Sequence, residues 1–553
     1  MNLILVTALI VVCVLLCTHL LRKKKLSKRY KAIKEGWGRP KETSYLNMLS
    51  IRRYFDRRTV VNNVYQVIDD DTCNDLDFDQ VFERMDHTSS KIGQQYLYYK
   101  LRVVQPKKDL TRFAALSSIF DENVETRTLF QRELSALNKV KDYKLEELTH
   151  LNIPKEPKIA MLLYILSIAA FAALGLSFYY PAFSLVLPFI FVVNMIFHYR
   201  NKETIGYYIR GLEVFSKAVP VAQFMARNED IQPFYTDFDF LRPLVSMRNK
   251  TRFLSTESKL FNEFMAVSWI VSECIKILFN IEYIAFHRLA DRIVKERNNL
   301  NKLFEFMGEL DVAISCASVR ASNTVTCSPV FSSGNSIFYT ELTHPLLTEC
   351  VPNDLDISNK SMLITGSNMS GKTTFIRAAA INALLAQTLH ICFAKRYSTP
   401  FFKIYSAIRI ADDLLNQKSY YLEEVLRIKT LVASSDDSNP CLFVMDELLK
   451  GTNTMERVSA GASIISFLNK EQHFVMVATH DMKLTQLLNP RDFELYHFTE
   501  SIEDSELSFD HKLKNGPLKT RNAIKILEIN GYPNEIIKQA QEIESRLSKV
   551  IDF

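Results

Sequence analysis

The stretch from Gly366 to Thr373 constrains the fold of this 553-residue chain more than any other. It reads Gly-Ser-Asn-Met-Ser-Gly-Lys-Thr and matches the phosphate-binding pattern G-x-x-x-x-G-K-[ST] at every fixed position. Residues 361–365 before it read as a buried strand, and residues 374–386 after it read as a helix. A strand, a glycine-rich loop and a helix N-terminus together cradle phosphate oxygens. A glycine-rich turn without a ligand is the alternative, and it does not account for all three features.

The side chains of this loop supply the first candidate site residues. Lys372 is predicted to reach the β- and γ-phosphates of ATP, and the Thr373 hydroxyl is predicted to bind Mg²⁺. ATP and Mg²⁺ are therefore the predicted cofactors. The candidate nucleotide-binding residues of this stretch are Gly366, Ser367, Asn368, Met369, Ser370, Gly371, Lys372, Thr373 and Thr374.

A second motif is an apolar run, residues 441–445, that ends in Asp446 and Glu447. At the carboxyl end of a strand, Asp446 is placed to hold Mg²⁺ through water, and Glu447 to polarise the attacking water. The alternative is a chance Asp-Glu pair in a turn. The presence of a phosphate loop in the same chain favours the catalytic interpretation.

Further strand candidates surround these two motifs. Residues 336–340 and 355–357 precede the loop, and residues 473–478 form an apolar run that is followed by His480. These strands alternate with helical segments from about residue 328 onward. The pattern predicts an α/β domain with a largely parallel sheet.

Between the two motifs, Ser419 opens the segment Ser-Tyr-Tyr-Leu-Glu-Glu424. Taken alone, Ser419 is better explained as an ordinary helix N-cap. The order along the chain favours another interpretation: a phosphate loop, a serine-led helix start, a strand ending in Asp-Glu and a strand ending in His is the order of ABC-type ATPases. In those enzymes the serine segment of one protomer meets the γ-phosphate held by the other, and a helix N-terminus suits that anion contact.

The N-terminal residues 3–21 carry no charged side chain and are long enough to cross about 30 Å of hydrocarbon as a helix. Basic residues follow this run, starting with Arg22 and Lys23. A cleaved signal peptide, the alternative, would carry its positive charge before the apolar run. The positive-inside rule therefore predicts that the chain enters the cytoplasm after this span, with its basic run against anionic headgroups.

A second uncharged run covers residues 159–197, about 39 residues and twice the length of one span. Residues 179–181, Tyr-Tyr-Pro, interrupt it near the middle, and basic residues flank both ends. We interpret it as a hairpin of two membrane helices. A buried hairpin of a soluble protein is the alternative, but such helices rarely stay apolar on all faces. The chain is thus predicted to be a multi-pass membrane protein with three spans and cytoplasmic domains.

The remaining sequence is mixed in character and carries no local chemistry. Residues 69–156 and 201–320 show apolar residues at three- and four-residue spacing, which predicts helices. The net charge of +6 is too small over this length to indicate nucleic-acid binding by itself. Nine cysteines occur without a C-x-x-C pair, so we expect reduced thiols in a cytosolic compartment.

Six stretches of the C-terminal part resemble the ATPase domain of the MutS family. The resemblance runs from about Val312 to Glu544 and extends more loosely over the helical regions. Gly531-Tyr-Pro533 and the helix after it resemble the closing helices of that family. The six stretches are His344-Pro345, Val351–Asp354, Thr365–Thr374, Ser419–Glu424, Met445–Glu447 with Gly451–Thr454, and Ala478–His480.

The resemblance implies a fold class and a division into domains. It implies an α/β ABC-type P-loop ATPase domain at the C-terminus, preceded by an all-α domain similar to the MutS core and lever. The transmembrane hairpin interrupts that helical domain, and an N-terminal transmembrane helix precedes it. The expected domains are 1–25 (anchor), 60–157 and 200–325 (the two halves of the helical domain), 158–199 (hairpin) and 326–553 (ATPase).

The resemblance also implies residue roles and partners. Asn368 would contact phosphate, His480 would sense the γ-phosphate, and Glu447, His480 and Lys372 would be the catalytic residues. Thr373 and Asp446 would hold the metal. Ser419 and Glu424 would act in trans on the partner protomer, because two such domains sandwich two ATP molecules in a homodimer. DNA is the ligand that the family suggests.

Several features depart from the family pattern. No mismatch-reading domain precedes the helical region, and Phe261-Asn-Glu263 has that domain's Phe-x-Glu spelling only by chance. The segment expected to hold the DNA clamp is short. The turn 349–351 has Cys and Val where the family often offers an aromatic to adenine. Residues 448–450, Leu-Leu-Lys, stand where the family usually has a Gly-Arg spacing before Gly-Thr. No Smr nuclease tail follows, unlike in one branch of the family.

Three functional hypotheses follow. The first is a membrane-anchored MutS-like ATPase whose composite dimeric site is coupled to DNA binding of a mismatch-repair-like but non-standard kind. The second is an ATP-driven component of a membrane or envelope complex that binds an unknown protein rather than DNA, with lipid around its spans. The third is a degraded ATPase that acts only as a nucleotide-gated scaffold, and the intact Lys372, Thr373, Asp446 and Glu447 argue against it.

Overall fold

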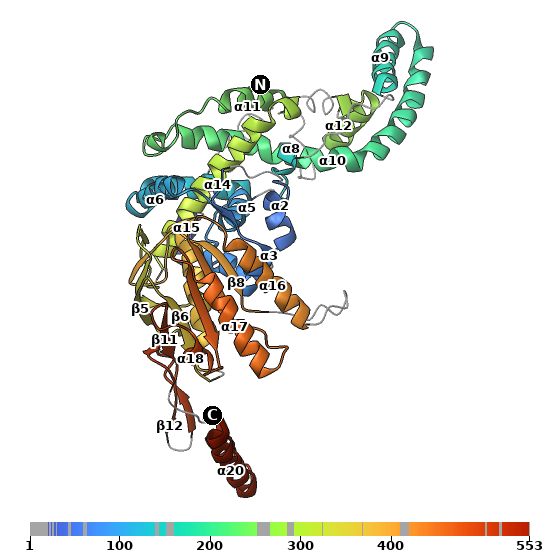
Figure 1. Ribbon diagram of the computed structural model, residues 1–553. Coiled ribbons are helices and arrows are strands. Elements are labelled where there is room, and N and C mark those ends of the chain that lie inside the picture. Colours follow the sequence, from blue (N-terminus) through green and yellow to red (C-terminus); the bar gives the residue numbers. More distant parts are fainter. Residues whose placement is uncertain are drawn as a thin grey trace. The chain divides into compact units, whose positions relative to one another are not determined.

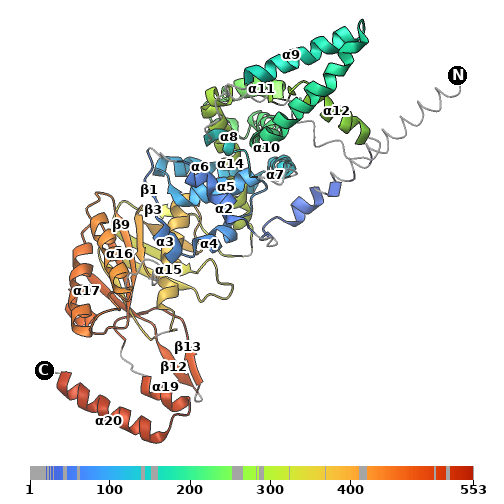
Figure 2. The same cartoon turned by 90° about the vertical axis from the view of Figure 1, so that its right-hand side faces the viewer.

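The structure is a computed structural model, and the chain in it divides into two compact units. The helical unit comprises residues 1–62, 86–99 and 112–322, and the sheet unit comprises residues 63–85, 100–111 and 323–553. Figure 1 and Figure 2 draw both from two directions. The described residues are 20, 24, 27–28, 30–41, 46–58, 63–138, 143–150, 160–251, 266–281, 283–284, 292–322, 324–367, 369–409, 420–503, 506–518 and 523–551.

A six-stranded sheet forms the centre of the sheet unit. Its strand order is β14-β11-β6-β10-β9-β8, and every neighbouring pair is parallel except β14 with β11. The predicted largely parallel sheet is therefore confirmed. The strands are β6 (Ser361–Thr365), β8 (Lys403–Ala407), β9 (Cys441–Asp446), β10 (Phe474–Thr479), β11 (Phe493–His497) and β14 (Lys514–Asn515).

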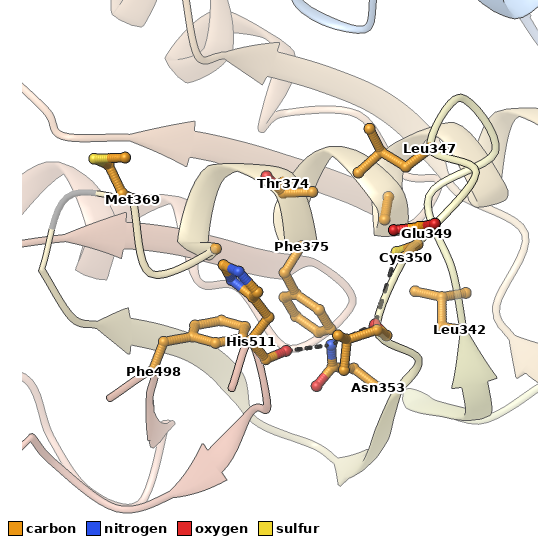
Figure 3. A pocket seen from close by; sticks show the side chains of 13 residues that line it. Leu342, Leu347, Glu349, Cys350, Asn353, Met369, Thr374, Phe375, Phe498 and His511 are labelled. Carbon is orange, nitrogen blue, oxygen red and sulfur yellow. Dashed lines mark hydrogen bonds between the residues drawn. The ribbon is translucent and has the colours of Figure 1, made fainter. Parts of the chain in front are cut away.

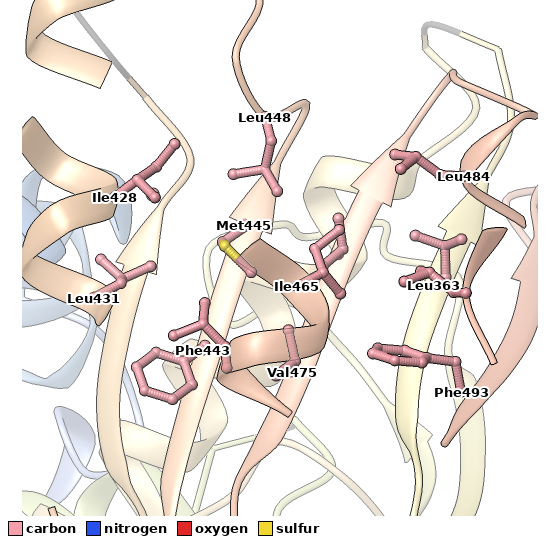
Figure 4. Close-up of a cluster of buried hydrophobic side chains, with 14 of the residues drawn as sticks. Leu363, Ile428, Leu431, Phe443, Met445, Leu448, Ile465, Val475, Leu484 and Phe493 are labelled. Carbon is pink, nitrogen blue, oxygen red and sulfur yellow. The ribbon is translucent and has the colours of Figure 1, made fainter. Parts of the chain in front are cut away.

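Helices cover this sheet and bury its apolar strands. Every residue of β6 and of β10 is buried, as expected for central parallel strands. A single apolar cluster joins Phe443 and Val475 of the strands to Ile465 of a helix that packs against them, as Figure 4 shows. The helices that follow these strands are α15 (Lys372–Leu389), α16 (Tyr420–Ser434), α17 (Thr454–Leu468) and α18 (Leu484–Leu487).

A second sheet of four strands, in the order β3-β7-β4-β5, belongs to the same unit. The predicted strands 336–340 and 355–357 are observed as β4 and β5, each slightly longer than expected. A hairpin of β12 and β13 and two closing helices complete the C-terminal part. The bounds are β3 (Val330–Phe331), β4 (Ser336–Leu342), β5 (Asn353–Ser358), β7 (Arg396–Thr399), β12 (Glu500–Glu503), β13 (Glu506–Phe509), α19 (Ala523–Ile529) and α20 (Asn534–Ile551).

Two early segments, residues 63–85 and 100–111, belong to the sheet unit although the sequence assigned them to the helical domain. The physical reason lies at the exposed edge of β8. The Gln66 amide exchanges two hydrogen bonds of 2.8 Å with the backbone of Ile404, and Asp75 accepts from the backbone N–H groups of Ile408 and Arg409. These side chains cover a strand edge that would otherwise lack partners. The segments contain β1 (Gln66–Val67), α3 (Asp70–Asp75), α4 (Phe78–Met85) and β2 (Val103–Val104).

Every regular element in the described part of the helical unit is a helix, as predicted. The long helix α14 (Arg297–Arg320) is its core, and most of its residues are buried. Glycines let α14 approach α5 (Lys91–Arg102) closely, because Gly93 faces Asp311 and Gly308 faces Tyr96. The other helices are α2 (Met48–Asp56), α6 (Lys107–Glu122), α7 (Val124–Leu137), α8 (Glu147–His150), α11 (Leu241–Thr251) and α12 (Ala266–Leu278).

The predicted membrane hairpin folds as two helices with a turn at the expected place. Helix α9 (Ala160–Ser177) is followed by a 3₁₀ turn (Pro181–Leu185) and by the 41-residue helix α10 (Val186–Ala226). Among the described residues, only the stretch Pro181–Arg200 is long and apolar enough to cross a membrane. The apolar part of α9, Met161–Ser177, falls short of the roughly 20 residues that a span needs. Three spans are therefore not supported, and the first of them, residues 3–21, lies outside the described residues.

Candidate functional site

The order of the central strands brings the predicted motifs to one edge of the sheet. Strand β10 pairs in parallel with β6 on one side and with β9 on the other. In this register Thr479 is level with Thr365, and Ala478 is level with Asp446. The phosphate loop, the Asp446-Glu447 pair and His480 therefore all follow the carboxyl ends of neighbouring strands.

The loop after β6 has the backbone shape of a phosphate cradle. Gly366 and Gly371 have φ values of 154° and 113°, which side chains disfavour. A Cβ atom at Gly366 would lie 2.9 Å from the carbonyl oxygen of Phe498. Within the loop, the buried Ser370 hydroxyl donates to the Ser367 carbonyl at 2.8 Å, while Met369 is 82% exposed. Both glycines of the motif are thus required by geometry.

Lys372, the first residue of α15, points its ammonium group back into the loop. Its Nζ donates to the carbonyl oxygens of Gly366 at 2.7 Å and Ser367 at 2.8 Å. Burial lowers the pKa of Lys372, and nearby carboxylates, Glu447 first among them, oppose this shift. The side chain is therefore held at the place where phosphate oxygens would meet the loop.

Thr373 and Asp446 form a pair of hard oxygen ligands. The Thr373 hydroxyl donates to Asp446 Oδ2 at 2.6 Å. The other carboxylate oxygen, Oδ1, is buried and has no hydrogen-bond partner in the part of the chain that the structure describes. Burial raises the pKa of Asp446, with the neighbouring Glu447 adding to the shift. A buried carboxylate oxygen without a donor, next to a hydroxyl, fits Mg²⁺, which prefers oxygen ligands.

Glu447 is held by two groups at the mouth of the site. It has a left-handed backbone with φ of 51°, and its N–H donates to the Ala478 carbonyl at 2.9 Å. Its Oε1 lies 3.3 Å from His480 Nδ1, and its Oε2 lies 3.1 Å from Lys450 Nζ. Burial by itself would raise the pKa of Glu447, but Lys450 and then His480 outweigh burial and lower it. The carboxylate is therefore ionised at neutral pH.

Two of the predicted residues, Asn368 and Ser419, lie outside the described residues. Glu424, which was predicted to act in trans, is 1% exposed and has a partner in its own chain. Its Oε1 accepts a hydrogen bond from the Leu449 N–H at 2.5 Å, and burial raises its pKa. This contact fixes the loop between Glu447 and Lys450. The trans roles of Ser419 and Glu424 stay predictions.

A cavity of about 170 Å³ opens beside the start of α15. Thr374, the last predicted loop residue, lines it together with the rings of Phe375, Phe498 and His511, as Figure 3 shows. The His511 ring nitrogen Nδ1 lies 3.0 Å from the Ser370 carbonyl oxygen. The Asn353 amide donates to the His511 carbonyl at 3.1 Å. A flat apolar group could bind between these rings.

Sequence reasoning did not identify Lys450, Phe498 or His511 as site residues. Lys450 was noted only as a departure from a family spacing, although it lies three residues after Glu447. Phe498 and His511 follow β11 and the β12–β13 hairpin, and neither belongs to a recognisable motif. Only Asn353, which donates to the His511 carbonyl, could have pointed to this part of the site, because it lies in Val351–Asp354, one of the six stretches that resemble the MutS family.

Part of the chain is similar to known proteins. The family model of MutS domain V matches residues 362–548, which all lie in the sheet unit. The DNA mismatch repair protein MutS of Thermus thermophilus is 29% identical over 361 residues, covering 63% of this chain and 41% of the relative. The protein of the same name from Clostridium kluyveri is 28% identical over 284 residues, covering 49% and 32%. That from Staphylococcus haemolyticus is 31% identical over 280 residues, covering 48% and 31%.

The chain covers only part of the length of each of these relatives. The chain spans about two fifths of the length of the first of these relatives and about a third of the others. The residues that the MutS domain V model matches include the phosphate loop, the Asp446-Glu447 pair and His480. On the matched domain and these relatives together, the sheet unit is similar to domain V of the MutS family.

Proposed function

We propose that this protein binds ATP with Mg²⁺ in the sheet unit and hydrolyses it. One observation carries the proposal: Lys372, the Thr373–Asp446 pair and the ionised Glu447 converge on one end of three adjacent parallel strands. Positioning and electrostatics are nearly all that phosphoryl transfer requires of a protein. The four side chains supply both.

Each residue has a distinct role in this proposal. The ammonium group of Lys372 would release its hydrogen bonds to the two loop carbonyl oxygens and donate to β- and γ-phosphate oxygens instead. Thr373 and Asp446 would hold Mg²⁺, which neutralises charge on the phosphate oxygens when bound. Glu447 would accept a hydrogen bond from the attacking water, because its carboxylate is ionised and already oriented by Lys450 and His480. His480, half exposed, would contact the γ-phosphate.

The cavity beside α15 is the proposed position of the adenine ring. The turn 349–351 offers Cys350 and Val351 rather than an aromatic, and both line the cavity. Phe498 and His511 enter from another part of the chain and supply the aromatic contact instead. Base stacking on a protein ring is worth about 1–3 kcal/mol. The site thus has room and chemistry for the base as well as for the phosphates.

Substitution of Lys372 tests the site directly. In full-length protein purified in detergent, Lys372→Ala is expected to reduce phosphate release from ATP to background and to weaken ATP binding. The matched control is Lys395→Ala, because Lys395 is an exposed lysine of the same unit that pairs only with Glu341 in the described contacts. Lys395→Ala should leave turnover unchanged, and turnover that survives Lys372→Ala would refute the assignment.

The active form is proposed to be a homodimer in which Ser419 and Glu424 of each chain complete the other chain's site. The support is the order of motifs and the similarity of the sheet unit to MutS domain V. Sedimentation of the full chain with ATP is expected to show a dimer when Glu447→Gln prevents hydrolysis, and a weaker dimer with ADP. A Glu447→Gln protein that binds ATP and stays monomeric would argue for a site completed within one chain.

We further propose that the chain is anchored in a membrane through the apolar stretch Pro181–Arg200 of the α9–α10 hairpin. The described part of the hairpin leaves large apolar side chains open: Ile168 is 69% exposed, Phe171 is 63% exposed and Phe189 is 71% exposed. Lipid acyl chains would cover such a surface. The protein is expected to sediment with membranes after an alkaline carbonate wash and to be released only by detergent.

DNA is the proposed ligand of the ATP-driven cycle, since the relatives are DNA mismatch repair proteins by name. Duplex DNA should bind the full chain at low salt and weaken by a factor of about 10³ or more between 50 and 200 mM salt, because phosphate contacts release counterions. The second candidate, a protein ligand in a membrane complex, is favoured by the exposed hairpin side chains. Absence of DNA binding even at low salt would select it.

A further inference from the structure

Two cysteines of the sheet unit face one another across a short antiparallel bridge. Cys327 lies just before β3, and Cys392 lies three residues after the end of α15. The Cys327 N–H donates to the Cys392 carbonyl at 2.9 Å, and the Cys392 N–H donates back to the Cys327 carbonyl at 2.9 Å. This reciprocal pair sets the two Cα atoms about 5.5 Å apart. Disulfides in proteins most often join Cα atoms at about this separation.

The two thiols also influence one another. The Cys392 thiol is fully buried and donates to the Asn382 carbonyl at 3.9 Å, and it interacts with the thiol of Cys327, which is only partly buried. Nearby, the rings of Phe331 and His390 lie 6.4 Å apart and hold the two segments together. No group of three metal-ligating side chains occurs in the described ranges, so a metal does not explain the pair. Both thiols are free in the structure.

We infer that Cys327 and Cys392 form a reversible, redox-sensitive disulfide that ties the entry of the chain into the sheet unit to the rear end of the phosphate-loop helix. The antiparallel bridge already brings the two Cα atoms to a separation that is common in disulfides. The partly exposed Cys327 gives an oxidant access to the pair, and the buried Cys392 lies within reach of it. This modification site is separate from the nucleotide site, so it stands whether or not ATP is hydrolysed.

The reaction balances with oxidised glutathione as the oxidant. The Cys327 thiolate attacks one sulfur of the glutathione disulfide, forms a mixed disulfide and releases one glutathione thiolate. The Cys392 thiol loses its proton and attacks the Cys327 sulfur, which forms the internal disulfide and releases the second glutathione. Two protein thiols are oxidised while one glutathione disulfide is reduced to two thiols.

The acidities of the two thiols support this order of events. The hydrogen bond from Cys392 lowers the pKa of the Cys327 thiol, and partial burial opposes that shift. Burial raises the pKa of Cys392. The nucleophile in thiol exchange is the thiolate, so Cys327 reacts first and Cys392 resolves.

Peptide mapping of the full-length protein in detergent tests the inference. After treatment with oxidised glutathione, alkylation of remaining thiols and trypsin digestion, peptide 321–360 is expected to be linked to peptide 378–395. Reduced glutathione in excess should release the link. Peptide 321–360 also contains Cys350, so Cys350→Ser is the matched control and should leave the link unchanged.

Two variants separate the steps. Cys392→Ser should retain one glutathione on Cys327, and Cys327→Ser should abolish both the link and the retained glutathione at this site. The mapping of the unsubstituted protein decides the matter if either variant fails to fold. An unlinked pair after oxidation, a link through Cys350, or glutathione that stays on Cys327 while Cys392 is present would each overturn the inference.

Discussion

Glu447 is the residue on which the proposed hydrolysis depends most. Glu447→Gln keeps the shape of the side chain but removes the negative charge that accepts a proton from water. A general base contributes about 10²–10⁴-fold to a rate, so ATP turnover should fall at least about 100-fold. ATP binding should persist because Lys372 and Thr373 are untouched. Phosphate release and nucleotide retention measure the two effects, with Glu471→Gln, an exposed glutamate, as the control.

Lys450 sets the acidity of that base. It is the strongest of the groups that lower the pKa of Glu447, and burial acts in the opposite direction. In Lys450→Met the pKa of Glu447 should rise, so the carboxylate becomes protonated, and inactive, at a higher pH than in the unsubstituted protein. The acidic limb of the profile of kcat against pH should move upward. Lys395→Met should leave it in place, and an unmoved limb in Lys450→Met would refute the coupling.

The positions of the proposed catalytic residues could be predicted because each is part of a contiguous motif at the end of a strand. Lys372, Asp446 and His480 follow apolar runs whose strand character is evident, and parallel pairing then brings the run ends together. Phe498 and His511 could not be predicted in the same way. His511 reaches the cavity through the β12–β13 hairpin and the backbone contact to Asn353, and Phe498 reaches it because its N–H donates to the Thr365 carbonyl at 2.9 Å.

At the scale of elements, the contact of α5 with α14 depends on a missing side chain at Gly93. A Cβ atom there would lie 2.1 Å from Asp311 Oδ2 and 2.8 Å from its Cβ. Asp311 cannot give way easily, because it accepts hydrogen bonds from the Ser89 and Ser90 N–H groups at 2.7 and 2.8 Å. Gly93→Ala should therefore destabilise the helical unit by at least roughly 2 kcal/mol.

Denaturant titration followed by tryptophan fluorescence measures that loss. Both tryptophans of the chain, Trp37 and Trp269, belong to the helical unit, so the signal reports that unit alone. Gly175→Ala is the matched control, because an added Cβ in that helix meets nothing within 4 Å. An unchanged midpoint for Gly93→Ala would mean that Asp311 is not fixed as the structure places it.

The elements themselves were largely predictable, and their grouping was not. Apolar periodicity at residues 69–156 indicates helices but not what they pack against. Gln66 and Asp75 carry the deciding information, since they satisfy the backbone at the β8 edge, a strand more than 300 positions later in the chain. Likewise, hydropathy located the hairpin turn, but the end of α9 at Ser177 leaves its apolar stretch shorter than a span needs.

At the scale of the whole molecule, buried carboxylates of the helical unit link its stability to pH. Burial raises the pKa of Glu146 to about 7, with the charge of Glu147 adding to the effect, and burial raises that of Asp311 to about 6. When a carboxyl group has a higher pKa in the folded than in the unfolded chain, its contribution to stability is fully present only at a pH below the unfolded pKa. That unfolded pKa is about 4.3 for Glu. The stability is then lost as pH rises through the folded pKa. The helical unit should therefore become less stable between about pH 5 and pH 8.

Substitution of Glu146 isolates its share of this effect. Glu146→Gln has no carboxylate charge to bury. Over that pH window its free energy of unfolding should therefore fall by roughly 3 kcal/mol less than that of the unsubstituted protein, for a pKa shift of this size. The two proteins should therefore differ more at pH 8 than at pH 5, with the variant the more stable at pH 8. Tryptophan fluorescence again reports the helical unit, and Glu125→Gln, at an exposed site, should follow the unsubstituted protein. Parallel stability curves for Glu146→Gln and the unsubstituted protein would show that Glu146 titrates alike in the folded and unfolded chain.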